Sequence, residues 1–304
     1  MPLTTTARRA AAVALLAVLG LAGLGAAPAA AGTAWTVRTA ANDFGADRRN
    51  YGYTLDPGGS LTDGLVIANP GTAPLRLSVY AADAFTTEDG RLDLLAQGAR
   101  SAAVGAWVRP SRPDVTVPAG GSVEVPFTLT LPPGAAPGEY LGGVVTAPAG
   151  SGERRGIRIR LRVGGELRPR LSVEDPRVGY AGGGDATVTY TIRNTGNAVL
   201  AARQAVSVSG VRAGRIGDSP RLLPGESWKV SVPVHGVTPV LRLTGTIEVV
   251  PLLTDASNSI APLAAVRATA SAWGVSWGWA LPAIAAGCGL VAAFVALRRR
   301  RASR

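Results

Sequence analysis

The chain has 304 residues, 47% of them hydrophobic, and a formal net charge of +11 that is concentrated at its two ends. Seven of its 31 Lys and Arg residues lie within residues 1–31 and 298–304, so 24 basic residues face 20 acidic ones between them. This near balance argues against a nucleic-acid-binding protein, which carries a clustered basic surface. One histidine, His235, and one cysteine, Cys288, are too few for a zinc or copper site, and we expect no cofactor.

Residues 1–31 have the pattern of a secretory signal peptide. Arg8-Arg9 precede an apolar run from Ala10 to Leu24, and small residues follow at 29–31. This order of basic, apolar and small residues is typical of an exported chain. We therefore expect the next part of the chain to fold outside the cell, without disulfides.

Residues 32–272 have the pattern of an all-β protein. Short β-rich runs alternate with Gly, Pro, Asn and Asp, and no long stretch has a helical period. The expected strands are Leu61–Ala68, Leu75–Ala82, Val104–Arg109, Ser122–Leu131, Tyr140–Ala147, Ile157–Val163, Val188–Arg193, Val240–Val250 and Leu263–Ala270.

The second half of this region repeats the turns of the first. Asn69-Pro70-Gly71 follows one predicted strand, and Asn194-Thr195-Gly196 follows another. In both halves a Pro- and Gly-containing turn that ends in Ser comes later, before a further strand. This order predicts two tandem immunoglobulin-like β-sandwiches, residues 32–165 and 166–272.

Tyr140 follows the turn Pro137-Gly138-Glu139 and begins a strand. This placement resembles a tyrosine corner, in which the hydroxyl bonds to backbone a few residues upstream. The alternative is a partly buried strand tyrosine.

Arginines alternate with apolar residues along the strand Ile157–Val163. This pattern buries the apolar side chains and places Arg158, Arg160 and Arg162 on one exposed face. Such a row suits anionic wall polymers or lipid headgroups. Alternatively, it is a charged edge strand that blocks pairing with other sheets.

The aromatic residues offer a second set of candidate contacts. The alternation in Leu75–Ala82 predicts that Arg76 and Tyr80 face outward. Exposed aromatics can stack on sugar rings. Trp107 is another candidate contact, with the core tryptophan of a sandwich as the alternative.

Residues 273–297 are predicted to form a transmembrane helix. Val275–Leu297 carries no charge, and Arg298–Arg301 follow at once. The length suffices to cross a bilayer, and the arginines favour a cytoplasmic tail at 298–304. The predicted topology is a single-pass type I membrane protein with an extracellular ectodomain and lipid contact through this helix.

Catalytic motifs are not found in the sequence. His235 lies at a predicted strand end without a G-x-S-x-G elbow, and we expect a surface turn residue there. No P-loop or dinucleotide fingerprint occurs. We therefore predict a protein that is not an enzyme.

Several stretches resemble the WxL-interacting protein family of Gram-positive bacteria, here with the composition of a high-GC, actinobacterial branch. The matching stretches are Asp56–Ser60, Ile67–Gly71, Val79–Ala84, Trp107-Val108, Pro137–Tyr140 with Gly142-Gly143, and Arg155–Val163. The resemblance covers most of residues 35–165. It implies a peptidoglycan-binding first domain, a second domain that binds a surface protein or acts as a spacer, and no enzymatic activity.

The leading hypothesis is a membrane-anchored surface protein that binds peptidoglycan or an anionic wall polymer and holds a partner protein at the envelope. Its candidate contacts are Arg76, Tyr80, Trp107, Arg158, Arg160 and Arg162. The alternative is an accessory subunit of a membrane protein assembly that has no affinity for glycans.

Overall fold

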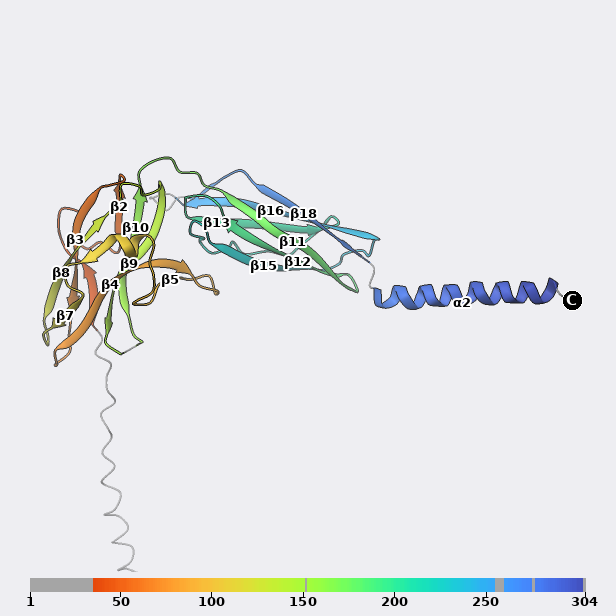
Figure 1. Ribbon diagram of the computed structural model, residues 1–304, viewed down its shortest axis with the longest axis horizontal. Helices are drawn as coiled ribbons and strands as arrows, with labels where there is room; N and C mark the ends of the chain where they lie inside the picture. Colours follow the sequence, from red (N-terminus) through yellow and green to blue (C-terminus); the bar gives the residue numbers. More distant parts are fainter. Residues whose placement is uncertain (1–34, 151, 255–259, 275–276, 303–304) are drawn as a thin grey trace, which may run out of the picture.

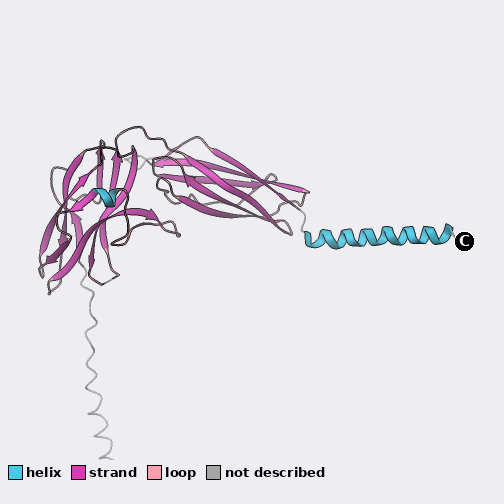
Figure 2. Cartoon of the chain, viewed as in Figure 1, coloured by secondary structure: helices cyan, strands magenta, loops and turns pink. Residues whose placement is uncertain are grey.

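The computed structural model describes residues 35–150, 152–254, 260–274 and 277–302. The predicted signal peptide lies outside these residues. The chain is mostly β, as predicted, and two sandwich-like pairs of sheets precede a C-terminal helix (Figures 1 and 2).

The first sandwich is built from a four-stranded and a six-stranded sheet. The four-stranded sheet has the order β1 (Thr36–Thr39), β3 (Ser60–Ala68), β8 (Ser122–Thr130) and β6 (Val108–Pro110). The six-stranded sheet has the order β2 (Tyr51–Leu55), β10 (Arg155–Val163), β9 (Gly138–Pro148), β4 (Leu75–Thr86) and β5 (Leu92–Leu94), and β7 (Asp114–Val117) also pairs with β4.

The inner faces of these sheets share one hydrophobic core. Leu65 and Phe127 from the four-stranded sheet, and Val79, Ile159 and Leu161 from the six-stranded sheet, are almost fully buried in the same cluster. Burial of one such side chain contributes about 1.5–3 kcal/mol. The alternating pattern of these strands therefore fixes which face of each sheet turns inward.

One segment predicted as a strand is partly helical. Instead of a strand over Val104–Arg109, the structure has the single turn α1 (Val104–Trp107), and only then β6. The carboxylate of Asp83 accepts hydrogen bonds from the backbone N–H groups of Ala102, Ala103 and Gly105, at 2.6, 3.0 and 2.7 Å. These bonds satisfy donors at the start of the turn and override the local preference for a strand.

The second sandwich has its own core. Its three-stranded sheet has the order β11 (Leu171–Gly182), β12 (Asp185–Asn194) and β15 (Ser227–Val234). The five-stranded sheet has the order β14 (Val211–Arg212), β13 (Leu200–Val208), β16 (Arg242–Thr254) and β17 (Ile260–Pro262), with β18 (Val266–Trp273) also pairing with β16. Val188, Ile192, Leu200 and Ile247 lie in this second cluster.

The repeated turns predicted from the sequence have the same hydrogen-bonding pattern in both sandwiches. Asn69 and Asn194 are both almost fully buried. The side-chain amide of Asn69 donates to the carbonyls of Ala73, Val117 and Pro118, at 2.8, 3.2 and 3.2 Å. In each turn the Asn Oδ1 accepts from the glycine two residues later, at 3.0 Å in the first and 3.1 Å in the second. Each asparagine thus replaces backbone partners at a sharp turn.

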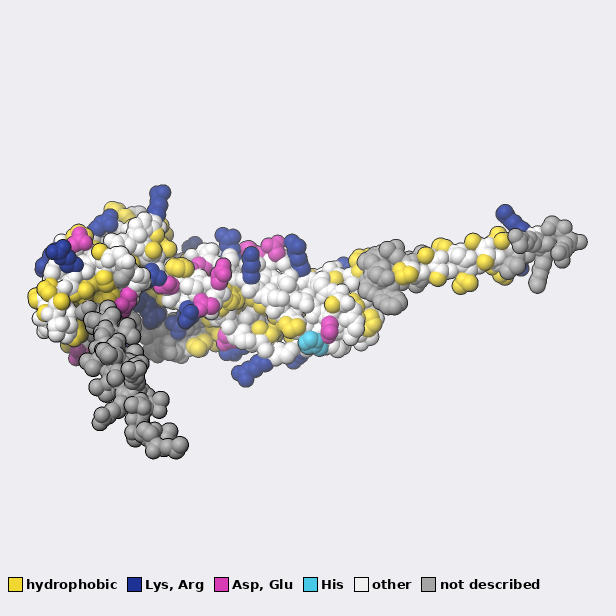
Figure 3. All heavy atoms as spheres, turned by 90° about the horizontal axis from the view of Figure 1, so that it is seen from below, with side chains coloured by type: hydrophobic (Ala, Val, Ile, Leu, Met, Phe, Trp, Pro, Cys, Tyr) yellow, Lys and Arg dark blue, Asp and Glu magenta, His cyan; other side chains and the backbone are white. Residues whose placement is uncertain are grey.

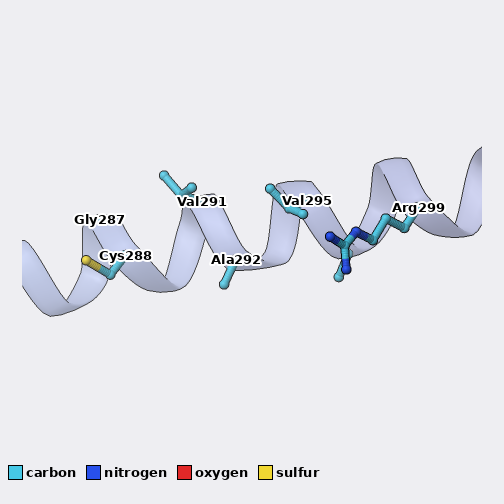
Figure 4. Close-up of a pocket in the computed structure, with 7 residues that line it drawn as sticks. Gly287, Cys288, Val291, Ala292, Val295 and Arg299 are labelled. Carbon is cyan, nitrogen blue, oxygen red and sulfur yellow. The ribbon is translucent and has the colours of Figure 1, made fainter.

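Helix α2 (Trp277–Ala302) follows the second sandwich and contains Pro282. It starts later than the predicted 273–297 and ends later. A shallow hollow along it is lined by one strip of this helix rather than enclosed by other elements, with Val291 and Val295 on one side and Ala292 on the other (Figure 4). Among the residues that the structure describes, no helix combines the length and the apolarity that crossing a membrane requires.

Candidate binding cleft between the two sandwiches

Strand β10 carries the row of arginines that the sequence predicts. Along it, Ile157, Ile159, Leu161 and Val163 are buried, while Arg158 and Arg162 are exposed and Arg160 is half-buried. We call Arg158, Arg160 and Arg162 the arginine row. The prediction that they share the outward face is confirmed.

The alternative interpretation of this strand as a charged edge is wrong. Strand β10 pairs with β9 on one side and with β2 on the other. The pairing with β2 is parallel and places Gly52 beside Arg160 and Thr54 beside Arg162. The charges therefore do not protect an edge, and they lie within a continuous outer face of the sheet.

A cleft of about 540 Å³ opens above the arginine row, between the two sandwiches. Strands β2, β9 and β10 form its floor, and Val199, Arg221 and Leu253 of the second sandwich line its other wall. Its lining residues are Gly52, Tyr53, Thr54, Leu92, Glu139, Tyr140, Leu141, Arg158, Arg160, Leu161, Arg162, Leu167, Val199, Arg221 and Leu253. Figure 3 shows basic and acidic side chains together where the two sandwiches meet.

Glu139 joins the floor of the cleft to its far wall. Its Oε2 accepts from the backbone N–H of Val199 at 2.8 Å, and its own N–H donates to the carbonyl of Asn197 at 2.8 Å. Its Oε1 lies 4.0 Å from Nη2 of Arg160. One acidic side chain therefore contacts the middle of the arginine row and also holds the second sandwich in place.

A second set of hydrogen bonds holds the two sandwiches together at β4. The N–H of Thr86 donates to Oε1 of Glu226 at 2.8 Å, and its hydroxyl donates to Oε2 at 2.7 Å. The hydroxyl also lies 3.0 Å from the carbonyl of Arg221. These contacts fix Arg221, which belongs to the second sandwich, at the wall of the cleft.

Arg76 and Tyr80 lie apart from the cleft, although they share the outer face of the same sheet. On β4, Leu77 and Val79 point into the core, so Arg76 is exposed and Tyr80 is half-buried on the other side. Leu94 lies over the strands between them and the arginine row, close to Gly143 and Gly156. Neither Arg76 nor Tyr80 lines the cleft.

Trp107 packs against the core of the first sandwich. It is partly buried, and its ring meets that of Tyr140 edge to face with 4.9 Å between centroids. The hydroxyl of Tyr140 donates to the carbonyl of Ala136 at 2.9 Å, which confirms the upstream bond expected of a tyrosine corner. Burial raises the pKa of this hydroxyl.

Among the tryptophans whose burial the structure describes, the most buried is one that the sequence analysis missed. Trp35 is 1% exposed, and its indole N–H donates to Oγ1 of Thr146 at 2.7 Å. The guanidinium of Arg155 lies over its ring, 5.0 Å from the centroid. Trp35 precedes the first strand, so no alternating pattern surrounds it that would have revealed its burial.

A buried charged network supports the strand at the outer side of the cleft floor. Asp63 on β3 is 3% exposed and forms an ion pair of 2.6 Å with Arg48. Its Oδ2 also accepts from the hydroxyl of Tyr53 at 2.6 Å, and its Oδ1 accepts from Nδ2 of Asn42 at 2.7 Å. Since Tyr53 belongs to β2, this network ties β2 to the opposite sheet.

The same network sets the charge states of its members. Burial alone would raise the pKa of Asp63, but the hydrogen bonds from Arg48, Tyr53, Gly64 and Asn42 outweigh it and lower this pKa below 3.8. Burial and the neighbouring carboxylate raise the pKa of the Tyr53 hydroxyl. Asp63 is therefore a satisfied structural anion, and its oxygens are committed to the fold.

Metal-binding groupings are not found among the described residues. No three His, Cys, Asp or Glu side chains in that part of the chain gather as a metal site. His235 is exposed and lies 2.8 Å from Oδ1 of Asp185, also exposed, at the far end of the second sandwich. The cleft is lined by arginines, one carboxylate, hydroxyl-bearing and apolar side chains, and its arginines suit it to binding an anion.

Comparison with known proteins finds only distant similarity, and only among solved structures. No family model and no curated protein matches it. Among solved structures, a chain of the chaperone–tip adhesin complex of CFA/I fimbriae shares 10% identity over 78% of this chain and 98% of that one, with a TM-score of 0.42. The DraB chaperone of E. coli shares 10% identity over 78% and 96%, with a TM-score of 0.34.

A family 123 glycoside hydrolase from Clostridium perfringens shares 12% identity, with a TM-score of 0.31. This match covers 43% of the present chain and 27% of the hydrolase. At such scores these likenesses decide neither ligand nor activity. The fold and the cleft define a two-sandwich β protein with an arginine-lined junction.

Proposed function

We propose that this chain is a membrane-anchored, non-enzymatic surface protein that holds an anionic cell-wall polymer in the cleft between two immunoglobulin-like sandwiches. The observation that carries the proposal is the arginine row on the floor of that cleft. Peptidoglycan with its attached polymers is the expected ligand, as the resemblance to the WxL-interacting proteins also implies.

The geometry of the row suits a ligand with repeated charges. Side chains two residues apart on a strand are about 6.6 Å apart along it. Guanidinium groups bind carboxylates and phosphates through paired N–H donors. Three such groups in line can therefore contact successive charges of an extended polymer, while Leu141 and Leu253 contact its apolar parts.

Membrane anchorage is the part of the proposal that rests on the sequence. Residues 275–297 carry no charge, and four arginines follow them. Leu290, Val291 and Phe294 of α2 are exposed in this structure, and lipid would cover them. Retention of the full chain in membranes after a carbonate wash is the expected result, and its release would refute anchorage.

The cleft is tested by co-sedimentation of the detergent-solubilised full chain with purified cell wall. The test variant is Arg158→Ala/Arg160→Ala/Arg162→Ala. The matched control, Arg38→Ala/Arg177→Ala/Arg193→Ala, removes the same charge from exposed strand positions outside the cleft.

We expect the test variant to lose most of its sedimentation and the control to keep it. Binding should also weaken in high salt, since exposed charges are screened. Wall stripped of its anionic polymers should bind far less than intact wall. Equal sedimentation of the two triple variants would refute the cleft as the site, and failure of the unaltered chain to sediment would favour the accessory-subunit alternative.

A further inference from the structure

The end of the second sandwich from which α2 departs exposes three large apolar side chains. Leu241 is 70% exposed, Trp273 is 61% exposed and Val240 is 43% exposed. We call these three residues the apolar tip. Exposing such side chains to water is unfavourable.

The fold holds the apolar tip in a defined place. Strands β16 and β18 pair so that Arg242 lies opposite Trp273, which brings Leu241 beside the end of β18. The N–H of Gly274 donates to the carbonyl of Leu241 at 3.3 Å. A Cβ at position 274 would clash with the carbonyl of Val240, so the chain passes tightly over the tip as it leaves the sandwich.

Two pairs of polar side chains lie at this end of the sandwich. Arg242 donates to the hydroxyl of Ser271 at 3.1 Å, and His235 faces Asp185. Tryptophan is enriched where proteins meet lipid headgroups, and Arg242 lies beside Trp273 at this end. The arginine can keep its charge among headgroups while its stem lies on apolar surface.

We infer that the apolar tip docks on the outer surface of the lipid bilayer beside the anchoring helix, an inference that rests on the membrane anchorage proposed above. The position of the tip favours lipid over a protein partner. Helix α2 begins at Trp277, just after Trp273, so an anchored helix brings the tip to the headgroup layer without any further contact.

Docking at this end sets the distance between the cleft and the membrane surface. Strand β16 runs from Arg242 at the tip to Thr254 near the cleft, where Leu253 lines the wall. A strand of this length spans roughly 40 Å. The second sandwich then stands on the membrane as a rigid spacer, and the arginine row is held at about that height.

The test uses the full chain with Cys288→Ser, labelled with an environment-sensitive fluorophore at one introduced cysteine. The test position is Leu241→Cys. The matched control is Ile260→Cys, which replaces another exposed apolar residue, on β17 at the opposite end of the same sandwich. Both proteins are reconstituted in vesicles of phosphatidylcholine and phosphatidylglycerol that contain lipid brominated near the headgroups.

We expect the label at 241 to lose most of its emission and the label at 260 to keep it. A second variant carries the label at Val240→Cys together with Leu241→Asp and Trp273→Asp, and it should escape quenching while a chain labelled at 240 alone does not. This pair separates docking driven by apolar contact from mere nearness to the helix.

Two outcomes would overturn the inference, and they are distinct. If the protein stays in carbonate-washed vesicles but the labels at 241 and 260 are quenched equally little, anchorage stands and docking is refuted. If the wash releases the protein, anchorage itself is refuted, and docking with it.

Discussion

The two sandwiches share a scaffold and differ in what they bury. Both end a strand with a buried asparagine, Asn69 or Asn194, that bonds to the turn beyond it. Only the first also buries a carboxylate, Asp63, among the described residues. The difference lies at β2, the strand beside the arginine row, which Tyr53 ties to Asp63. The sandwich that carries the arginine row thus has a buried ionic network between its two sheets, and the second sandwich has no buried carboxylate among the described residues.

The largest expected effect breaks this difference. Asp63→Ala removes the buried carboxylate that pairs with half-buried Arg48 and accepts from the Tyr53 hydroxyl, and it should lower the free energy of unfolding of the first sandwich by about 3–5 kcal/mol. Denaturant unfolding followed by hydrogen exchange, strand by strand, measures it. The control Asp185→Ala removes an exposed carboxylate from the second sandwich and should change little. Equal effects of the two would contradict a structural role for the buried network.

In the unaltered chain, acid should destabilise the first sandwich before the second. Because the pKa of Asp63 is lower in the fold than its ordinary value of 3.8, its ionised form stabilises the fold above pH 3.8. That stability is lost as the pH falls through the lower, folded pKa. Hydrogen exchange at decreasing pH should therefore show the first sandwich opening before the second, and Asp63→Asn should remove most of this pH dependence.

A smaller effect tests what the sandwiches share. Asn69→Ala and Asn194→Ala each leave buried carbonyls without their donor, at a cost of about 1–3 kcal/mol. We expect similar losses, each confined to its own sandwich by hydrogen exchange. Thr195→Ala, at an exposed position of the same turn, should be nearly neutral. A loss at one asparagine alone would show that the turns are not equivalent.

The smallest effect on stability concerns the junction. Asn197 donates to the carbonyls of Pro137 and Glu166, both at 2.9 Å, and accepts from the N–H of Arg168 at 2.6 Å. Asn197→Ala should cost less than about 1.5 kcal/mol, because its partners are solvent-accessible. Small-angle scattering should nevertheless show a broader range of domain orientations than in the unaltered chain. An unchanged profile would mean that Glu139 and Thr86 suffice.

Local alternation in the sequence was enough to predict most strands, but not their neighbours. The pattern of β10 gave its buried and exposed faces correctly. Its position inside the sheet depends on β2, more than a hundred residues earlier, and the pattern carries no sign of that pairing. The error at Val104–Trp107 has the same origin, since the carboxylate that organises the turn belongs to Asp83 on another strand.

One wall of the candidate site could be predicted from the sequence, and the opposite wall could not. The arginine row follows from alternation, but Val199, Arg221 and Leu253 join it only through the docking of the second sandwich. Arg76 and Tyr80 followed from the same kind of alternation and Trp107 from its aromatic ring, yet none of the three lines the cleft. A carboxylate inside an apolar strand, as in Leu61–Leu65, was the one local sign of the Asp63 network.

The parallel pairing of β2 with β10 has a mechanical consequence. If a wall polymer grips the first sandwich while the helix is held in the membrane, tension leaves that sandwich through the end of β10. This strand is hydrogen-bonded on both sides, over nine residue pairs to β9 and five to β2. A pull along it loads these bonds together in shear instead of opening them one after another. The strand that presents the arginines is also the one best placed to bear the load.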